Sequence, residues 1–290
     1  MARVLLTGAR GFIGAAVLRR LRADGHEAIM LSSSGGSEGG EWRQLDLLQA
    51  GEDEIARLVG EERITHCLHS AWYTNHSDYL VAEINRDWVQ ASLRLEAGFR
   101  AGGGRRFVGL GTCLEYDRHG TNGRFSELST PLRPETLYAR CKRALFDELS
   151  GRGGDFAWAR VFFVYGPGDR SGRLIPLIVE GLARGEKVAA RFGGLRRDYV
   201  HVEDLAGQLS RLAFAPVQGA INTGTGAAAR VADIFVLAGE IAGRPDLVEV
   251  NDLVGAGEAE VIESDMGRFR AEVGDPATRP LRQGLEELMA

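Results

Sequence analysis

A glycine-rich turn between an apolar strand and an amphipathic helix constrains the fold of this chain most strongly. The segment RVLLT reads as a buried strand, and TGARGFIG follows it directly. Gly8 permits a sharp turn, Gly11 lets the backbone approach a pyrophosphate, and Gly14 permits close packing of a helix. That helix is expected over 12–23, and its N-terminus supplies unpaired N–H groups and partial positive charge. The context predicts a dinucleotide-binding turn with GxxGxxG spacing; the alternative is a glycine-rich turn without a ligand.

Strand-like and helical segments alternate from residue 27 to residue 166. The strand-like segments are 27–32, 42–47, 64–72, 105–112 and 156–166, and the longer helical ones are 78–101 and 134–150. This alternation predicts an α/β fold with a Rossmann-type, doubly wound parallel sheet and a smaller α/β C-terminal lobe. We expect a dinucleotide-binding domain over 1–164, to which 199–225 returns. The substrate-binding lobe is then expected from 165–198 and 226–290.

The end of the second strand distinguishes NAD from NADP in such folds. A carboxylate there accepts a hydrogen bond from the adenosine ribose and repels a 2′-phosphate. This chain has Ser32, Ser33 and Ser34 instead, and Arg10 in the glycine turn is within reach of a 2′-phosphate. The pattern favours NADP over NAD, with Arg10 as a solvated loop residue being the alternative. Asp46, after the third strand, is placed to accept a hydrogen bond from the adenine amino group.

Tyr138 and Lys142 stand four residues apart in a segment expected to be helical. This spacing puts both side chains on one helix face, and lysine is a rare choice in a chain with 2 lysines and 33 arginines. A neighbouring ammonium favours the phenolate, so Lys142 is expected to lower the pKa of Tyr138 from its usual value of about 10. Lysine also suits two ribose hydroxyls better than the planar fork of arginine. Thr112, at the end of the fifth strand, is the candidate hydroxyl for the substrate oxygen. The alternatives are a surface i,i+4 pair and a β-forming threonine.

The composition of the chain limits the classes of binding partner and the cellular compartment that we expect. The net charge is −5, so no general attraction to nucleic acid or to an anionic membrane surface is expected. No apolar run approaches the ~20 residues that span a bilayer, and we expect a cytoplasmic protein. The three cysteines, Cys67, Cys113 and Cys141, form no CxxC pair. We therefore expect neither a metal site nor a disulfide framework.

Several segments together resemble the extended short-chain dehydrogenase/reductase family, the NAD(P)-dependent sugar-nucleotide epimerases, dehydratases and reductases. In chain order they are TGARGFIG, HCLHSAW, GTCLEYD, LYARCK, RVFFVYGPGDR, RRDYVHVEDLA and INTGTG, and they cover nearly the whole chain. HCLHSAW resembles a fourth-strand segment that ends in H-x-A-A and lines the cofactor through Ser70, Ala71 and Trp72. Asn85 matches an asparagine usual in the following helix. GTCLEYD places Thr112 at the catalytic hydroxyl.

The resemblance implies a set of site residues, a cofactor and a partner. The implied catalytic residues are Thr112, Tyr138 and Lys142. The implied cofactor contacts are Gly8, Arg10, Gly11, Phe12, Ile13, Gly14, Ser32, Ser33, Asp46, Leu47, Ser70, Ala71, Trp72, Lys142 and Phe162. The implied substrate contacts are Trp72, Thr112, Phe163, Arg173 and Arg197, with the last expected on the diphosphate. The cofactor is NADP or NAD, and the partner is a nucleotide-diphospho-sugar; Trp72 and Phe163 are alternatively core residues.

Departures from the family pattern bear on the reaction. Family dehydratases carry Asp-Glu directly after the catalytic threonine, whereas this chain has Cys113 and Leu114, which offer no general acid–base pair. The usual asparagine of the sixth strand is Phe163, which removes a polar contact to the substrate. At 290 residues, the chain is close in length to the keto-sugar reductases.

These observations predict an NADP-dependent reductase acting on the 4-keto group of a nucleotide-diphospho-6-deoxy-sugar. A 4-epimerase with retained NAD would use the same three residues and is the alternative. A non-catalytic cofactor sensor is a third reading, and retention of both Tyr138 and Lys142 argues against it. A homodimer formed through the tyrosine helix and its neighbour is also expected. The candidate interface residues, which alternatively face the sheet, are Leu93, Phe99, Leu145 and Leu149.

Overall fold

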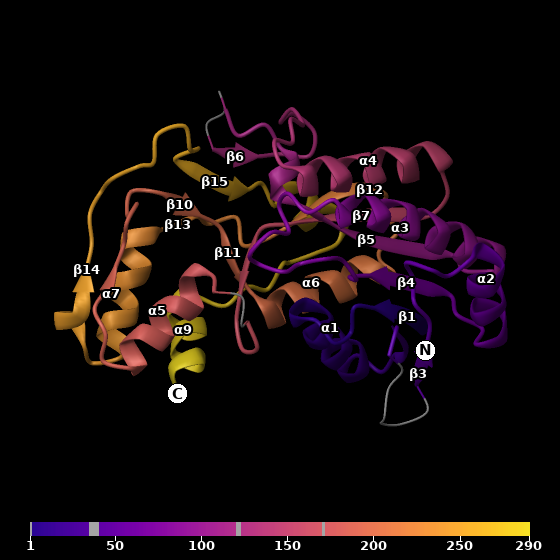
Figure 1. The fold of residues 1–290 in the computed structure, drawn as a ribbon, viewed down its shortest axis with the longest axis horizontal. Coiled ribbons are helices and arrows are strands. Elements are labelled where there is room, and N and C mark those ends of the chain that lie inside the picture. Colours follow the sequence, from indigo (N-terminus) through magenta and orange to yellow (C-terminus); the bar gives the residue numbers. More distant parts are fainter. Residues whose placement is uncertain (1, 35–40, 120–122, 170–171) are drawn as a thin grey trace.

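A seven-stranded parallel sheet forms the larger part of the molecule (Figure 1). The computed structural model describes residues 2–34, 41–119, 123–169 and 172–290. The strand order is β12-β7-β5-β4-β1-β2-β3, with β1 next to β4 where the direction of winding changes. The strands are β1 (Arg3–Thr7), β2 (Glu27–Ser32), β3 (Trp42–Gln44), β4 (His66–His69), β5 (Arg106–Thr112), β7 (Phe156–Val161) and β12 (Gly219–Thr223). This arrangement confirms the predicted Rossmann-type fold.

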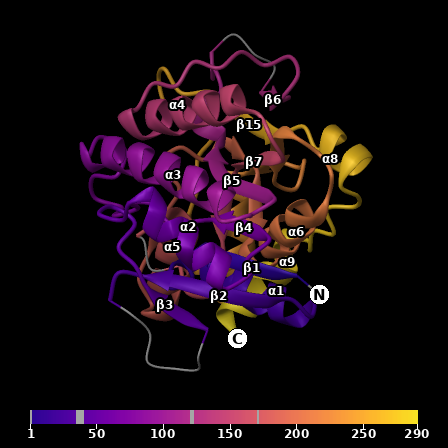
Figure 2. The same ribbon diagram turned by 90° about the vertical axis from the view of Figure 1, so that its right-hand side faces the viewer.

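Helices cover both faces of this sheet, as Figure 2 shows. On one face lie α2 (Glu52–Glu61), α3 (Ile84–Ala101) and α4 (Leu137–Arg152). On the other lie α1 (Phe12–Ala23) and α6 (Val202–Phe214), which pack against each other, with the short α8 (Gly267–Glu272) next to β12. Burial on both faces explains why the strands read as continuous apolar runs.

A smaller lobe packs at the carboxyl-terminal edge of the sheet (Figure 1). Its helices are α5 (Leu174–Ala183), α7 (Val231–Ile241) and α9 (Leu281–Met289), which share one apolar core. Its strands form three small sheets. The first contains β13 (Ala229–Arg230), β10 (Arg196–Arg197), β15 (Val261–Ser264) and β6 (Arg124–Phe125). The second pairs β11 (Tyr199–His201) with β8 (Phe163–Tyr165), and the third pairs β14 (Val248–Glu249) with β9 (Val188–Ala189). Two short 3-10 turns, η1 (Cys113–Glu115) and η2 (Pro245–Leu247), complete the elements.

The apolar segment 156–166 is two strands and not the single one predicted. The chain changes partner at Phe162, whose N–H donates to the carbonyl of Thr223, while the N–H of Phe163 donates to the carbonyl of Asp198. β7 therefore stays beside β12 in the large sheet, and β8 pairs with β11. At this change of partner the chain passes from the large sheet into the lobe, next to the cavity described below.

The two helices expected at a dimer interface bury the predicted apolar residues inside the protomer. Leu93, Phe99, Leu145 and Leu149 all belong to the core on the α2–α4 face of the sheet. The proposed interface role of these four residues was therefore wrong, and their alternative assignment to the sheet face is confirmed. The homodimer itself stays a prediction. None of the helices formed by the described residues is long and apolar enough to cross a membrane.

Candidate active site

The glycine turn after β1 is shaped so that side chains would obstruct it. Gly8 has φ +73°, and a Cβ there would lie 2.7 Å from the backbone nitrogen of Ala71. A Cβ on Gly14 would lie 2.0 Å from the carbonyl oxygen of Gly8. Gly11 is the N-cap of α1 and makes no side-chain cap bond, so the first N–H groups of the helix remain open to a ligand. The turn fits a pyrophosphate.

A chain of buried hydrogen bonds connects this turn to the end of β4. The backbone N–H groups of Ser70 and Ala71 both donate to Thr7 Oγ1, each at 3.1 Å. The Thr7 hydroxyl lies 2.8 Å from His69 Nδ1, and His69 Nε2 lies 2.8 Å from Ser92 Oγ. Burial lowers the pKa of His69 to about 3, so the ring is neutral and bridges two hydroxyls. Sequence reasoning missed this role of Thr7 and His69, although each immediately precedes a predicted cofactor segment.

The adenosine end of the cofactor site is built around Arg10. Its Nη1 donates to Ser34 Oγ at 2.7 Å, and its guanidinium lies 5.0 Å from the centre of the Trp42 ring. The Ser32 hydroxyl lies 3.3 Å from that of Ser34. The arginine is therefore held at the end of β2, beside hydroxyl groups. Asp46 is exposed and its Oδ1 accepts the N–H of Leu48 at 3.0 Å.

The remaining predicted cofactor residues fall in two groups. Ile13, Ser70, Trp72, Lys142 and Phe162 line the cavity described next. Phe12 packs against the core at the start of α1, Leu47 is buried, and the Ser33 carbonyl accepts from Gln44 Nε2 at 3.2 Å.

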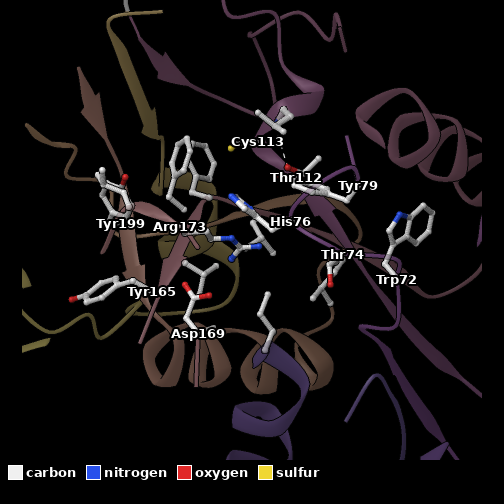
Figure 3. Close-up of a pocket in the computed structure, with 18 of the residues that line it drawn as sticks. Trp72, Thr74, His76, Tyr79, Thr112, Cys113, Tyr165, Asp169, Arg173 and Tyr199 are labelled. Carbon is white, nitrogen blue, oxygen red and sulfur yellow. Dashed lines mark hydrogen bonds between the residues drawn. The ribbon is translucent and has the colours of Figure 1, made fainter. Parts of the chain in front are cut away.

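A cavity of about 500 Å³ lies where the sheet, the glycine turn and the lobe meet. It brings together the three predicted catalytic residues, Thr112, Tyr138 and Lys142. Figure 3 shows side chains from β5, from the loop before α3 and from the lobe converging on it. Its predicted substrate-side residues are Trp72, Phe163 and Arg173.

Thr112 ends β5 and begins the 3-10 turn η1. Its backbone N–H donates to Glu115 Oε1 at 2.9 Å, and its Oγ1 accepts the N–H of Leu114 at 3.3 Å. These reciprocal bonds form a capping box, which fixes the threonine in one geometry. Because Oγ1 acts as the acceptor in that bond, its own proton is available to an oxygen in the cavity.

Tyr138 and Lys142 project from the first turns of α4. Thr136 caps this helix by accepting the N–H of Ala139, and the N–H of Tyr138 donates to the carbonyl of Leu80. The tyrosine ring meets the edge of Tyr79, with ring centres 5.2 Å apart. The cap and the two contacts to the loop before α3 orient the tyrosine toward the cavity.

The expected lowering of the Tyr138 pKa by Lys142 was wrong. Burial raises the pKa of Tyr138, and the neighbouring Tyr79 adds to the rise, while Arg173 opposes it. Lys142 Nζ lies 5.9 Å from the Tyr138 ring centre. Burial also lowers the pKa of Lys142 to about 7, against the opposing charge of Glu115. Tyr138 is consequently protonated, which is the state that a proton donor requires.

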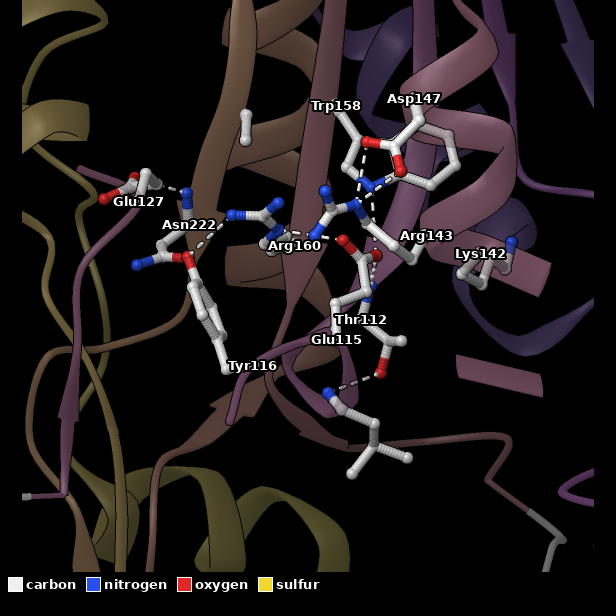
Figure 4. A network of polar contacts seen from close by, with 12 residues as sticks. Thr112, Glu115, Tyr116, Glu127, Lys142, Arg143, Asp147, Trp158, Arg160 and Asn222 are labelled. Carbon is white, nitrogen blue, oxygen red and sulfur yellow. Dashed lines mark hydrogen bonds and ion pairs between the residues drawn. The ribbon is translucent and has the colours of Figure 1, made fainter. Parts of the chain in front are cut away.

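A buried ion pair lies behind Thr112 and was not predicted (Figure 4). Glu115 Oε2 accepts from Arg160 Nε at 2.9 Å, and Glu115 Oε1 also accepts from Trp158 Nε1 at 2.9 Å. Arg160 Nη1 reaches the Tyr116 hydroxyl at 3.2 Å. The signal was an arginine within an otherwise apolar strand segment and a glutamate three residues after another, since such charges are buried only when paired.

The lobe side of the cavity is largely apolar and aromatic, with a few polar groups. Arg173 and His76 both project into it (Figure 3). Among the described residues, the Arg173 guanidinium has no ion-pair or hydrogen-bond partner, so it is available to an anionic ligand. The apolar wall next to Thr112 consists of Cys113, Leu114, Phe162, Phe163, Leu174 and Ile175.

Arg197 is not among the residues that line the cavity. Its guanidinium donates to the carbonyl oxygens of Arg196, Ala259 and Glu260 and pairs with Glu258 at 3.0 Å. These contacts occupy the side chain, whose guanidinium also lies 5.9 Å from the ring centre of Phe163. The predicted contact of Arg197 with the diphosphate stays a prediction. Residue 170, at the end of the RVFFVYGPGDR segment, lies outside the described residues.

Comparison with known proteins agrees with this geometry. Residues 4–224 match the model of the NAD dependent epimerase/dehydratase family. The chain belongs to that family. The glycine turn, the H-x-A-A segment and the Thr-Tyr-Lys set of the described cavity all lie within the matched residues.

Three family relatives indicate the range of chemistry. A dTDP-6-deoxy-L-talose 4-dehydrogenase (NAD(P)(+)) of Kitasatospora kifunensis is 29% identical over 99% of this chain and 94% of its own length. A dTDP-glucose 4,6-dehydratase of Neisseria gonorrhoeae is 25% identical over 74% of this chain and 70% of its own length. The solved structure of a Thermus thermophilus UDP-glucose 4-epimerase with NAD is 25% identical, has a TM-score of 0.80, and covers 99% of this chain and 97% of its own. The family thus includes NAD-dependent dehydrogenases, dehydratases and epimerases of sugar nucleotides.

Proposed function

We propose that the protein reduces the 4-keto group of a nucleotide-diphospho-6-deoxy-sugar, using NADPH in preference to NADH. The observation that carries this proposal is the cavity in which Thr112, Tyr138 and Lys142 meet a wall without an acid–base pair. Cys113 and Leu114 occupy the positions that follow the threonine, and burial raises the pKa of the Cys113 thiol to about 12. A neutral thiol and an alkyl chain do not support elimination of water.

The residues present fit a nicotinamide dinucleotide. The Gly8–Gly14 turn and the N-terminus of α1 would hold the pyrophosphate, and Lys142 would hold the ribose next to the nicotinamide. Arg10, beside the hydroxyls that end β2, would hold a 2′-phosphate, which is the basis for the NADP preference. When bound, the reduced nicotinamide supplies the hydride.

Side chains of the protein bind the substrate carbonyl oxygen and supply its proton. The Thr112 hydroxyl donates a hydrogen bond to the substrate carbonyl oxygen and fixes its position. Tyr138, protonated because it is buried, donates its proton to that oxygen as the alcohol forms. Lys142 stabilises the phenolate that remains.

The lining of the cavity supports a deoxygenated sugar on an anionic carrier. The apolar side chains of Leu114, Phe163 and Ile175 suit a methyl group. Arg173 would neutralise one phosphate of the diphosphate. The Kitasatospora relative, whose name specifies a dTDP-6-deoxy sugar and position 4, supports both features of this substrate.

A 4-epimerase is the second candidate, because the Thermus structure shares the fold and the cofactor class. The two reactions differ in cofactor turnover, since an epimerase regenerates its NAD within each cycle. Retention of NAD through gel filtration without net NADPH consumption would favour the epimerase.

The test is a screen of purified protein against nucleotide-diphospho-4-keto-6-deoxy-sugars with NADPH and NADH, followed at the reduced-nicotinamide absorbance band. We expect substrate-dependent oxidation of NADPH, faster than that of NADH, with loss in Tyr138→Phe. Absence of oxidation with every 4-keto sugar, or equal turnover in Tyr138→Phe, would contradict the proposal.

A further inference from the structure

Lys142 is buried in an unusual way for a lysine. Only 4% of it is exposed, and its Nζ donates to the carbonyl oxygen of Leu110 at 2.8 Å. Among the residues that the structure describes, no carboxylate pairs with it; instead the ammonium lies 3.6 Å from the centre of the Trp72 ring. That distance is well within the ~6 Å at which a cation is attracted to an indole face.

The indole is itself held in place. Trp72 Nε1 donates to Asn85 Oδ1 at 2.7 Å, and Asn85 is fully buried. The amide nitrogen of Asn85 donates to the carbonyl oxygens of Tyr79 and Ala82, each at 2.7 Å. The indole N–H of Trp72 is therefore hydrogen-bonded to Asn85, and the face of the ring is directed at the Lys142 ammonium. These two contacts together fix the orientation of the ring.

Other groups around Lys142 do not replace this contact. Glu115, on η1, favours the ammonium through space but is bonded to Arg160 and to the backbone of Thr112. Cys141, on the same helix, acts in the same direction and more weakly. His69, on β4, is neutral, and Tyr138 is protonated. The Trp72 face and the Leu110 carbonyl are thus the closest contacts of the charge, since the ring centres of Tyr138 and Trp158 each lie 5.9 Å from Nζ.

We propose that Trp72 is a positioning residue for Lys142, whose ammonium group it holds by a cation–π contact and keeps charged inside the cavity. Of the three donors on Nζ, one is bound to the Leu110 carbonyl, and the geometry leaves capacity for a ligand hydroxyl in the cavity that Lys142 lines. The consequence for catalysis rests on the proposed function; the contact itself does not.

The sequence supports a specific role for this tryptophan. Trp72 stands at the last position of the segment that resembles H-x-A-A, where a small side chain would leave the ammonium without an aromatic face. The ring centre of Trp88 lies 6.2 Å from that of Trp72, but among the described rings the ones near the Lys142 ammonium are those of Trp72, Tyr138 and Trp158. Trp88 is a matched control, being a second partly buried tryptophan that packs against the same core.

The test uses the scarcity of lysine in this chain. Protein labelled with ¹³C at the lysine ε-carbon gives two lysine signals, from Lys142 and from the exposed Lys187, which pairs with Glu249 and serves as the internal reference. Each signal is titrated with pH in the wild type and in Trp72→Leu, Trp72→Phe and Trp88→Leu. Trp72→Leu keeps an apolar side chain and removes the π face, whereas Trp72→Phe provides a smaller π face.

We expect Trp72→Leu to lower the Lys142 titration midpoint by about one pH unit and Trp72→Phe to lower it by about half as much. NADPH affinity near neutral pH should weaken in the same order, by roughly tenfold in Trp72→Leu, while Trp88→Leu leaves both quantities unchanged. A wild-type midpoint in both Trp72 variants, or an equal shift in Trp88→Leu, would overturn the proposal. The titration requires no substrate, so it succeeds or fails independently of the nucleotide-sugar screen.

Discussion

Two buried cations lie beside β5, and their pKa values shift in opposite directions. Arg160 lies against the carboxylate of Glu115 at 2.9 Å, with side chains 2% and 0% exposed. Burial opposes the charge on Arg160, but Glu115 and Tyr116 outweigh it and raise the pKa. Lys142 has a carbonyl and an indole in place of a carboxylate, and burial lowers its pKa to about 7.

The difference between the two cations lies in their partners. A buried cation with a bonded carboxylate keeps its charge at every ordinary pH and holds neighbouring groups in place. A buried cation with only dipoles and a π face titrates near neutrality and responds to what enters the cavity. The first arrangement suits a support for Thr112, and the second suits a group that works on a ligand.

The largest expected effect comes from removing the titrating cation. Lys142→Met and Lys142→Arg should each lower kcat/KM by roughly 10²- to 10⁴-fold, because the planar guanidinium does not reproduce the compact ammonium. Steady-state kinetics with NADPH measure this effect. Lys187→Arg, at the other and exposed lysine, is the control and should retain full activity. An active Lys142→Arg would show that any positive charge suffices.

Breaking the ion pair between Glu115 and Arg160 should mainly lower the stability of the fold. Glu115→Gln leaves Arg160 buried with an uncompensated charge and should lower the free energy of unfolding by about 3–5 kcal/mol. Asp147→Asn, which breaks the neighbouring half-exposed pair with Arg143, should cost less than about 1 kcal/mol. Denaturant titrations of both variants compare the two losses. Equal losses would mean that burial of the Glu115 pair is not what matters.

The pH dependence sharpens the comparison. The folded-state pKa of Lys142 is lowered to about 7, so its ammonium is present below that pH and is lost as the pH rises through it. We expect kcat/KM to be level below neutrality and to decline above about pH 7, since this parameter reports on the free enzyme. Rate profiles in overlapping buffers at constant ionic strength test this. A level profile through pH 9 would contradict the assignment, provided that circular dichroism shows no unfolding.

The smallest expected effect concerns a third, exposed cation. Arg10→Gln should raise the KM for NADPH by about tenfold and leave that for NADH nearly unchanged, because only NADPH carries the 2′-phosphate. Arg22→Gln, which removes another exposed arginine of the same α1 region, is the matched control. An equal rise for both cofactors in Arg10→Gln would place Arg10 on a group that they share.

Much of the cofactor half was predictable because its chemistry is local. The TGARGFIG turn places a positive φ and two close backbone approaches within eight consecutive residues, and Tyr138 and Lys142 lie one helical turn apart. Such short spacings define geometry without the rest of the fold. Local spacing did not reveal the partners of Arg197, which lie about sixty residues away in the chain, at 258–260.

The sequence by itself determined the alternation of strands and helices, the glycine turn and the residue types at Thr112, Tyr138 and Lys142, because periodicity and short spacing encode these features. The tertiary structure decided the charge states. Glu115 meets Arg160 across 45 positions of sequence, and Trp72 meets Lys142 across 70. A pKa depends on burial and on through-space neighbours, and neither is a property of any local stretch of chain.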